Sequence, residues 1–206
     1  MKNKPILIIA GQPKSIFFEI FFKSLKFNNF KSPLLIITSF KLFKSQMKKF
    51  KYKKKIKIIN FKKLDNYRLT NKQINIINVN YDRTNTSKGK INTTNLYIKN
   101  CFDVAFEILK NGKTNKFLNG PINKSSFLNK KFLGITEYIS KKFNTKNTSM
   151  LIYTKDLSVS PLTTHLPIKL VHKKINKKLI KEKIKLINNF YINNIGFKPK
   201  IAVLGL

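Results

Sequence analysis

The chain has 206 residues and a mass of 24.1 kDa, enough for one sizeable hydrophobic core or two small ones. Hydrophobic residues make up 42% of it, which is a globular composition, and no apolar run approaches the ~20 residues that span a membrane. A net charge of +35 suggests nucleic acid or an anionic membrane as partner, but only Arg68 and Arg83 are arginines, the residue that nucleic-acid readers favour. The lysines accompany many Asn and Ile residues, as an AT-rich coding sequence would produce. The sequence therefore favours coding bias over nucleic-acid binding as the origin of the positive charge.

The N-terminus and the cysteine usage bear on the compartment. Residues 1–10 superficially resemble a secretory signal, but the apolar part is short and residues 11–14 are a poor cleavage site. Cys101 is the only cysteine, which excludes an internal disulfide framework and fits a reducing compartment. It lies among apolar residues of an expected helix, which favours packing over nucleophilic chemistry. We therefore expect a first strand at the N-terminus and a cytoplasmic protein.

The first third of the sequence alternates strands and helices. Short apolar runs predict buried strands at residues 5–10, 33–38 and 56–61. Between them, apolar residues at helical spacing predict amphipathic helices at 16–27 and 40–50. Continuous apolar strands separated by helices are typical of a parallel sheet that is covered on both faces.

The middle of the chain is less regular. Residues 73–79 alternate as in a strand, and the polar residues 81–92 predict a loop. A helix is expected to begin after Thr93 or Thr94, either of which can act as N-cap, and to end before Gly112. The remaining elements are expected to be a short strand, a helix, two adjacent strands, a helix and a last strand, at residues 117–119, 134–143, 150–154, 157–163, 177–194 and 200–204.

The segment Thr163-Thr164-His165-Leu166-Pro167 is expected at the end of the strand at 157–163. Open α/β sheets place their sites just outside the carboxyl ends of strands, and a neutral imidazole is a common metal ligand and acid–base group. A second interpretation stays open, in which the segment only caps the next helix and the ring of His165 is solvated. The other histidine, His172, lies in a lysine-rich helical pattern.

Few other residues are candidates for chemistry. Glu19 and Glu137 each lie near a glycine-containing turn at a strand–helix junction, but an acid in the first turn of a helix is also favoured by the helix dipole alone. The phosphate-binding patterns GxGxxG and GxxxxGK[ST] are missing, which disfavours a classical Rossmann or P-loop protein. Three segments remain, namely Gly120-Pro121-x-x-Lys124, Gly134-x-Thr136-Glu137 and Thr163 to Pro167.

In their order and spacing, these segments resemble the 4-hydroxythreonine-4-phosphate dehydrogenase family of vitamin B6 biosynthesis. That family shows Gly-Pro-x-x-Lys, then Gly-His-Thr-Glu, then Thr-Thr-His-Leu-Pro, and then a strand that ends in Gly-Leu, matched here by Gly205-Leu206. The N-terminal residues 11–20 look like a degraded copy of the family's Gly-Asp-Pro-Ala-Gly-Ile-Gly-Pro-Glu-Ile. The resemblance spans the whole chain, and four motifs in order are more specific than any one alone.

The resemblance implies an isocitrate/isopropylmalate-dehydrogenase-like α/β/α sandwich, incomplete at the C-terminus, with a lobe boundary near residues 115–135. It implies a homodimer that oxidises 4-phosphooxy-L-threonine, a phosphorylated hydroxy amino acid, with NAD and decarboxylates it to 3-amino-2-oxopropyl phosphate. A divalent metal (Zn, Mg or Co) would polarise the reacting oxygen. His165 matches a metal ligand, Thr136 a substrate contact, and Lys124 and Glu137 positions that support catalysis.

The sequence also departs from the family. Ile135 stands where the family has a substrate-contacting histidine, and isoleucine forms no side-chain hydrogen bond. Ser15 and Phe17 replace glycines of the N-terminal loop. The family's other metal-binding histidines and its phosphate-binding basic residues fall after Leu206, and a catalytic metal needs about three protein ligands. We therefore expect a truncated or split relative that is inactive alone. The alternative is a catalytically dead basic protein that binds nucleic acid through its lysine-rich faces, the densest being residues 48–55.

Overall fold

The computed structural model describes residues 4–81, 90–128, 131–145, 147–164 and 166–205, without the side chains of residues 90–92. The chain divides into an N-terminal unit, residues 1–129, and a C-terminal unit, residues 130–206, and each is described by itself. The division falls inside the range expected for a lobe boundary, residues 115–135. That the two units are the lobes of the complete family fold stays a prediction.

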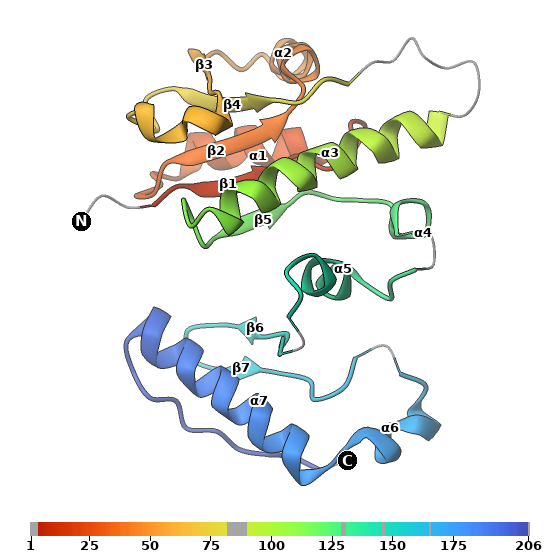
Figure 1. Ribbon diagram of the computed structural model, residues 1–206. Coiled ribbons are helices and arrows are strands. Elements are labelled where there is room, and N and C mark those ends of the chain that lie inside the picture. The colour runs from red at the N-terminus through yellow and green to blue at the C-terminus, as the bar shows by residue number, and fades with distance from the viewer. Residues whose placement is uncertain (1–3, 82–89, 129–130, 146, 165, 206) are drawn as a thin grey trace. The chain divides into compact units, whose positions relative to one another are not determined.

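A five-stranded parallel sheet forms the centre of the N-terminal unit (Figure 1). Its order is β3-β4-β2-β1-β5, so β2, β3 and β4 all lie on one side of β1, with β4 between β2 and the edge strand β3, and β5 lies on the other side. The register pairs Ile8 of β1 with Ile36 of β2 and with Leu118 of β5. The strands are β1 (Ile6–Ile9), β2 (Leu34–Thr38), β3 (Ile56–Ile58), β4 (Ile74–Asn78) and β5 (Phe117–Asn119).

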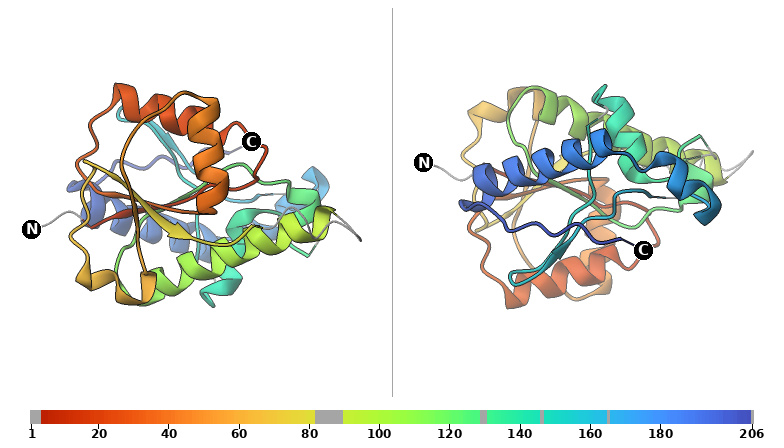
Figure 2. Two further views of the ribbon diagram at one scale, coloured as in Figure 1. Left: turned by 90° about the horizontal axis from the view of Figure 1, so that it is seen from above. Right: turned by 90° about the horizontal axis from the view of Figure 1, so that it is seen from below.

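Helices cover both faces of this sheet, as the sequence predicted. The helices α1 (Phe17–Phe27) and α2 (Phe40–Lys49) lie on one face, and α3 (Lys90–Lys110) lies on the other (Figure 2). Because side chains alternate along a strand, one set of strand residues meets α1 and α2 and the other set meets α3. The first set includes Ile8, Ile36 and Ile76, which pack with Phe18 and Phe43.

The ends of α2 and α3 follow from local sequence. The hydroxyl of Ser39 accepts a hydrogen bond from the backbone N–H of Leu42, which caps the N-terminus of α2. Gly112 has a φ of 68° directly after α3, the left-handed conformation that glycine adopts at helix ends. This confirms the predicted end of the helix.

Two predictions in this unit are wrong in detail. The helix α3 begins at Lys90 and not after Thr93 or Thr94, because Lys90-Ile91-Asn92 holds no residue that breaks a helix. The hydroxyl of Thr94 instead lies 3.3 Å from that of Tyr81. The rest of the loop predicted at 81–92, residues 82–89, lies outside the described residues. The third strand ends at Ile58 and a 3₁₀-helix, η1 (Phe61–Asn66), follows it.

The C-terminal unit consists of short elements. The strands β6 (Ile152–Tyr153) and β7 (Ser158–Val159) are adjacent, as predicted, and pair in antiparallel fashion, but each is only two residues long. The expected strand at 200–204 is wrong, because residues 200–204 pair with no strand among the described residues. The helices are α5 (Ile135–Lys142), α6 (Ile168–Lys174), α7 (Lys177–Phe190) and a π-helical turn η2 (Tyr191–Ile195).

Tyr191 ties the end of α7 to the β6–β7 pair. Its hydroxyl donates a hydrogen bond of 2.8 Å to the hydroxyl of Ser158, and its ring meets that of Phe197 edge to face at 5.5 Å. Tyr191 and Tyr138 are the large side chains that are buried in the described part of this unit. None of the described helices is both long and apolar enough to span a bilayer.

Candidate functional site

The strand order of the N-terminal unit points to the junction of β1 and β5. The chain leaves β1 toward β2 on one side, and β5 occupies the other side. In open α/β sheets, ligands bind outside the carboxyl ends of strands at the place where the strand order reverses. Gly11 and Gly120 follow β1 and β5 at this place.

The two loops are joined there by their backbones. The N–H of Gly120 donates to the carbonyl of Ile9 at 2.7 Å, and the N–H of Gln12 donates to the carbonyl of Pro121 at 2.8 Å. A Cβ on Gly11 would lie 2.4 Å from the oxygen of Pro121, and one on Gly120 would lie 2.3 Å from the oxygen of Ala10. Both positions therefore need glycine, and the space between the loops is filled by the protein's own backbone.

Lys124 is held beyond this junction by a capped turn. It is the first residue of α4 (Lys124–Phe127), and the side-chain oxygen of Asn123 accepts from the N–H of Ser126 at 3.1 Å. Asn95 of α3 donates to the carbonyl of Ser126 at 3.0 Å, which fastens α4 to α3. The Lys124 side chain is exposed, and its ammonium makes no ion pair or hydrogen bond within the described part of the chain. It is free to meet an anionic ligand.

The polar side chains at the ends of β2 and β4 form hydrogen bonds within the protein itself. The hydroxyl of Tyr97 lies 3.0 Å from that of Thr38 and accepts from the N–H of Ser39 at 3.2 Å. Asn78 accepts from the N–H of Phe40 at 2.8 Å. Burial raises the pKa of Tyr97, so its hydroxyl stays neutral and anchors the start of α2.

Cys101 lies one turn after Tyr97 on α3 and is 1% exposed. Burial raises the pKa of its thiol to about 12, so the nucleophilic thiolate is suppressed at neutral pH. This confirms the predicted packing role. Glu19, the other open question from the sequence, pairs with Lys23 at 2.7 Å, which supports its interpretation as a surface acid in the first turn of α1.

In the C-terminal unit, three candidates share the first turn of α5. Gly134 precedes the helix in an extended conformation, and Ile135, Thr136 and Glu137 follow it, all half-buried. One carboxylate oxygen of Glu137 is buried and has no hydrogen-bond partner among the described residues. An unsatisfied buried oxygen costs about 1–3 kcal/mol or more, so this atom is suited to a donor supplied by a ligand. Ile135 offers no polar atom to such a ligand.

The expectation for the segment at 163–167 is corrected in one respect. The strand β7 ends at Val159, so Thr163 and Thr164 do not end a strand, and the pair that contains β7 is separate from the parallel sheet. The short β6–β7 turn and its hydroxyl contacts end the pairing early, as Ser160 donates instead to the carbonyl of Met150 at 2.7 Å. His165 lies outside the described residues. His172 is exposed on α6.

The predicted site residues therefore fall into two groups. Ile135, Thr136 and Glu137 lie together on α5, whereas Lys124 belongs to the N-terminal unit. In the ranges that the structure describes, no three His, Cys, Asp or Glu side chains gather into a possible metal site. Sequence reasoning missed Asn123, although an Asn directly before a helix is a recognisable cap, and Asn95, for which only the fold gives a signal.

A family model described as "Pyridoxal phosphate biosynthetic protein PdxA" matches residues 29–206. The 4-hydroxythreonine-4-phosphate dehydrogenase of Aquifex aeolicus is 31% identical over 212 residues, which cover 99% of this chain and 63% of the relative. The chain belongs to the PdxA family. The enzyme of the same name from Hydrogenobaculum is 40% identical over 99 residues, covering 46% of this chain and 31% of that one. The resemblance inferred from the motifs is thus confirmed.

Solved structures agree on the fold. The 4-hydroxythreonine-4-phosphate dehydrogenase of Klebsiella pneumoniae superposes with a TM-score of 0.76 at 19% identity, covering 95% of this chain and 61% of that one. The protein of the same name from Burkholderia phymatum gives 0.75 at 21% identity, with coverages of 92% and 58%. This PdxA-family chain therefore has the expected isocitrate/isopropylmalate-dehydrogenase-like α/β/α fold, and it spans 63% of the length of its Aquifex relative.

Proposed function

We propose that this PdxA-family chain contributes to the NAD-dependent oxidation and decarboxylation of 4-phosphooxy-L-threonine to 3-amino-2-oxopropyl phosphate. The family match over residues 29–206 carries the proposal. The substrate would bear an ammonium group, a carboxylate, a hydroxyl and a phosphate. We assign to this chain residues that can meet such groups, and we place the reaction in the cytoplasm.

Each assigned residue has a chemical role of its own. The exposed ammonium of Lys124 suits an anionic group of the substrate, because it has no carboxylate partner in the described chain. The unsatisfied oxygen of Glu137 suits an N–H or O–H donor of the substrate. Thr136 can donate and accept beside it. Ile135 lies in the same turn and can only contribute apolar contact.

The described residues do not by themselves complete the metal site that the family implies, because no three possible ligands gather among them. The packed backbone between Gly11 and Gly120 is a structural junction and is not assigned to a cofactor. The divalent metal, its predicted ligand His165 and the NAD contacts remain proposals.

A turnover assay tests the proposal. The purified chain alone is expected to form no NADH from 4-phosphooxy-L-threonine. A chimera that continues with the Aquifex residues beyond the matched region is expected to be active. In that chimera, Glu137→Gln should lower kcat/KM by about 10²-fold, a typical loss for a catalytic or transition-state contact, whereas Glu182→Gln on α7 should not. An inactive but folded chimera, or equal effects of both substitutions, would contradict the assignment.

We also propose that the active form is a homodimer. The C-terminal unit leaves several large apolar side chains open to solvent, among them Ile168 at 81% and Leu157 at 71% exposure. Isolated apolar residues are common on surfaces, but a unit with so few buried ones gains from a partner surface. Light scattering after size exclusion should give twice the chain mass for the chimera, and a monomeric but active chimera would refute the dimer.

A further inference from the structure

One surface of the N-terminal unit is basic in a way that the proposed enzyme does not use. Residues 20–64 contain no Asp or Glu. Eleven lysines lie within residues 41–63 of this stretch, which we call the lysine face. They are Lys41, Lys44, Lys48, Lys49, Lys51, Lys53, Lys54, Lys55, Lys57, Lys62 and Lys63.

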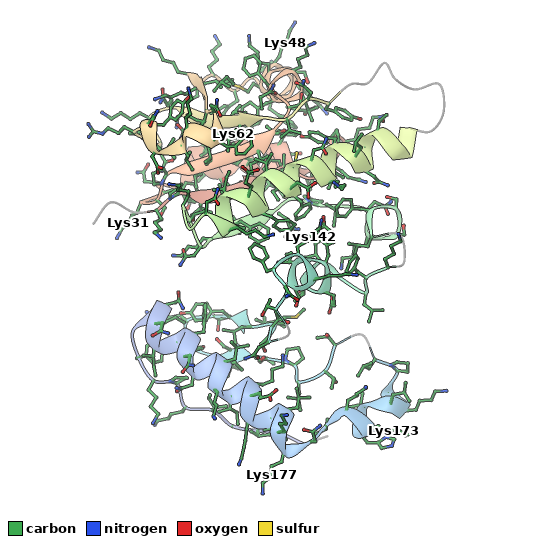
Figure 3. The ribbon with its side chains drawn as sticks, in the orientation of Figure 1. Lys31, Lys48, Lys62, Lys142, Lys173 and Lys177 are labelled. Carbon is green, nitrogen blue, oxygen red and sulfur yellow. The ribbon has the colours of Figure 1, made fainter. Side chains whose placement is uncertain are left out.

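These lysines project from consecutive elements at one end of the sheet. They come from α2, the turn after it, the edge strand β3 and the start of η1, and only Lys54 and Lys57 are half-buried (Figure 3). Lys48 and Lys62 are labelled at two points of this surface. Because the core beneath is closely packed, the ammonium groups are mounted on a rigid support.

The described residues give this face no direct ion pair, and its acidic neighbour is Glu19, which the charge of Lys49 influences without pairing with it. None of the ion pairs among the described residues involves a lysine of this face. Glu19 and Asp65, the acids that bound the acid-free stretch, are paired with Lys23 and Lys113, which lie outside the face. Cations within a Debye length of about 8 Å repel one another, so a bound polyanion would relieve an existing cost.

Aromatic rings are interleaved with the charges. The ammonium of Lys44 lies 5.3 Å from the ring centre of Phe40, and that of Lys49 lies 5.4 Å from Phe50. Lys57 lies 5.3 Å from the ring of Tyr67 in the same manner. Surfaces that bind single-stranded nucleic acids without sequence preference combine basic side chains with accessible aromatic rings in this way.

A membrane is the less suitable polyanion for this face. Phe50 and Tyr52 pack against Phe22, with the rings of Tyr52 and Phe22 stacked at 4.8 Å, so these rings stay partly accessible at the surface but cannot extend from it into lipid. Ile58 is the one large apolar side chain of residues 41–63 that is exposed. Anionic lipid would attract the same charges, but a stable interfacial site adds buried apolar area to that attraction, and this surface offers little beyond Ile58.

We propose that the lysine face binds the phosphodiester backbone of single-stranded nucleic acid. This binding is separate from the dehydrogenase site and does not depend on catalysis. The lysines act as point charges on phosphates, so the binding discriminates little between base sequences.

The test compares two sets of four exposed lysines in the full chain. In the first variant, Lys44, Lys48, Lys53 and Lys55 become Gln; in the control, Lys173, Lys177, Lys178 and Lys181 of α6 and α7 become Gln, which removes the same charge. Fluorescence anisotropy of a labelled oligothymidylate of about 20 nucleotides reports the affinity. The first variant should bind at least about tenfold more weakly at low salt, and its salt slope should be shallower by about 3, as four lost phosphate contacts require.

The affinity of the control variant for the oligonucleotide should stay within about twofold of that of the parent chain. If both variants weaken binding equally, the charge acts diffusely and the assigned surface is wrong. A third variant with Arg at the four positions of the lysine face should bind as the parent does, and its loss of binding would also contradict the proposal. Stronger co-sedimentation with phosphatidylserine vesicles than binding to the oligonucleotide would assign the face to membranes instead.

Discussion

The two units differ in how much of their apolar surface they bury by themselves. In the N-terminal unit, both faces of the sheet are covered, and side chains such as Phe18, Phe43 and Phe102 are at most 1% exposed. In the C-terminal unit, the paired residues Ile152 and Val159 are 59% and 54% exposed. A parallel sheet with helices on both faces completes its own core, whereas a two-stranded pair does not.

The helix α7 shows what the difference means. Its apolar stripe is as regular as that of α1, yet Leu179, Ile180, Ile184 and Ile187 remain half-buried. Amphipathicity therefore forms the helix in both units, but only the N-terminal unit supplies the surface that the stripe needs. The stability of the N-terminal unit should depend on its own side chains, and that of the C-terminal unit should depend on what covers it.

Removing one aromatic ring from each unit should give the largest difference in the free energy of unfolding. Phe43→Ala deletes a fully buried ring that lies 5.4–6.2 Å from Phe18, Phe21 and Phe22, so it should lower the free energy of unfolding by about 3–5 kcal/mol. Phe190→Ala, whose residue is 45% exposed, should cost less than about 1 kcal/mol. Urea unfolding followed by far-ultraviolet circular dichroism reports both units, and reaction of the Cys101 thiol identifies the transition of the N-terminal unit. Equal losses in the two variants would abolish the distinction between the units.

The loop junction at β1 and β5 offers a sharper comparison within the N-terminal unit. Gly11→Ala places a Cβ 2.4 Å from the Pro121 oxygen at a φ of 74°, so it should cost about 2–4 kcal/mol. Gly112→Ala meets nothing within 4 Å at a φ of 68° and should cost only about 1 kcal/mol, the conformational part alone. The same urea titration measures both. If Gly112→Ala were as harmful, the close approach of the two loops would contribute nothing to stability.

Sequence reasoning succeeded where a structural feature depends on neighbouring residues. The apolar runs at β1 and β2, the stripe of α1 and the glycine after α3 each follow from local preference. Elements whose existence depends on pairing were less predictable, which is why the strand expected at 200–204 is missing and β7 stops at Val159.

The candidate site divides in the same way. The motif residues Lys124 and Glu137 could be named from the sequence, but the unsatisfied oxygen of Glu137 could not, because its burial is a property of the folded chain. Nor could the contact from Asn95 to the turn after Lys124, since the two segments are 31 residues apart. Roles that depend on one residue type are readable from sequence, and roles that depend on surroundings need the fold.

The smallest effect concerns Glu19 at the surface of α1. A side-chain hydrogen bond from Lys23, the charge of Lys23 and that of Lys49 hold the pKa of this carboxyl below its ordinary value of 4.5. Because the folded-state pKa is the lower one, the ionised form stabilises the fold above pH 4.5, and this contribution is lost as the pH falls through the folded-state pKa. Glu19→Gln should therefore flatten the fall of the thermal midpoint between about pH 6 and about pH 3, with a change near the limit of detection for so exposed a pair. Glu182→Gln removes the same charge from the C-terminal unit, and an equal flattening there would assign the effect to net charge and not to the pair with Lys23.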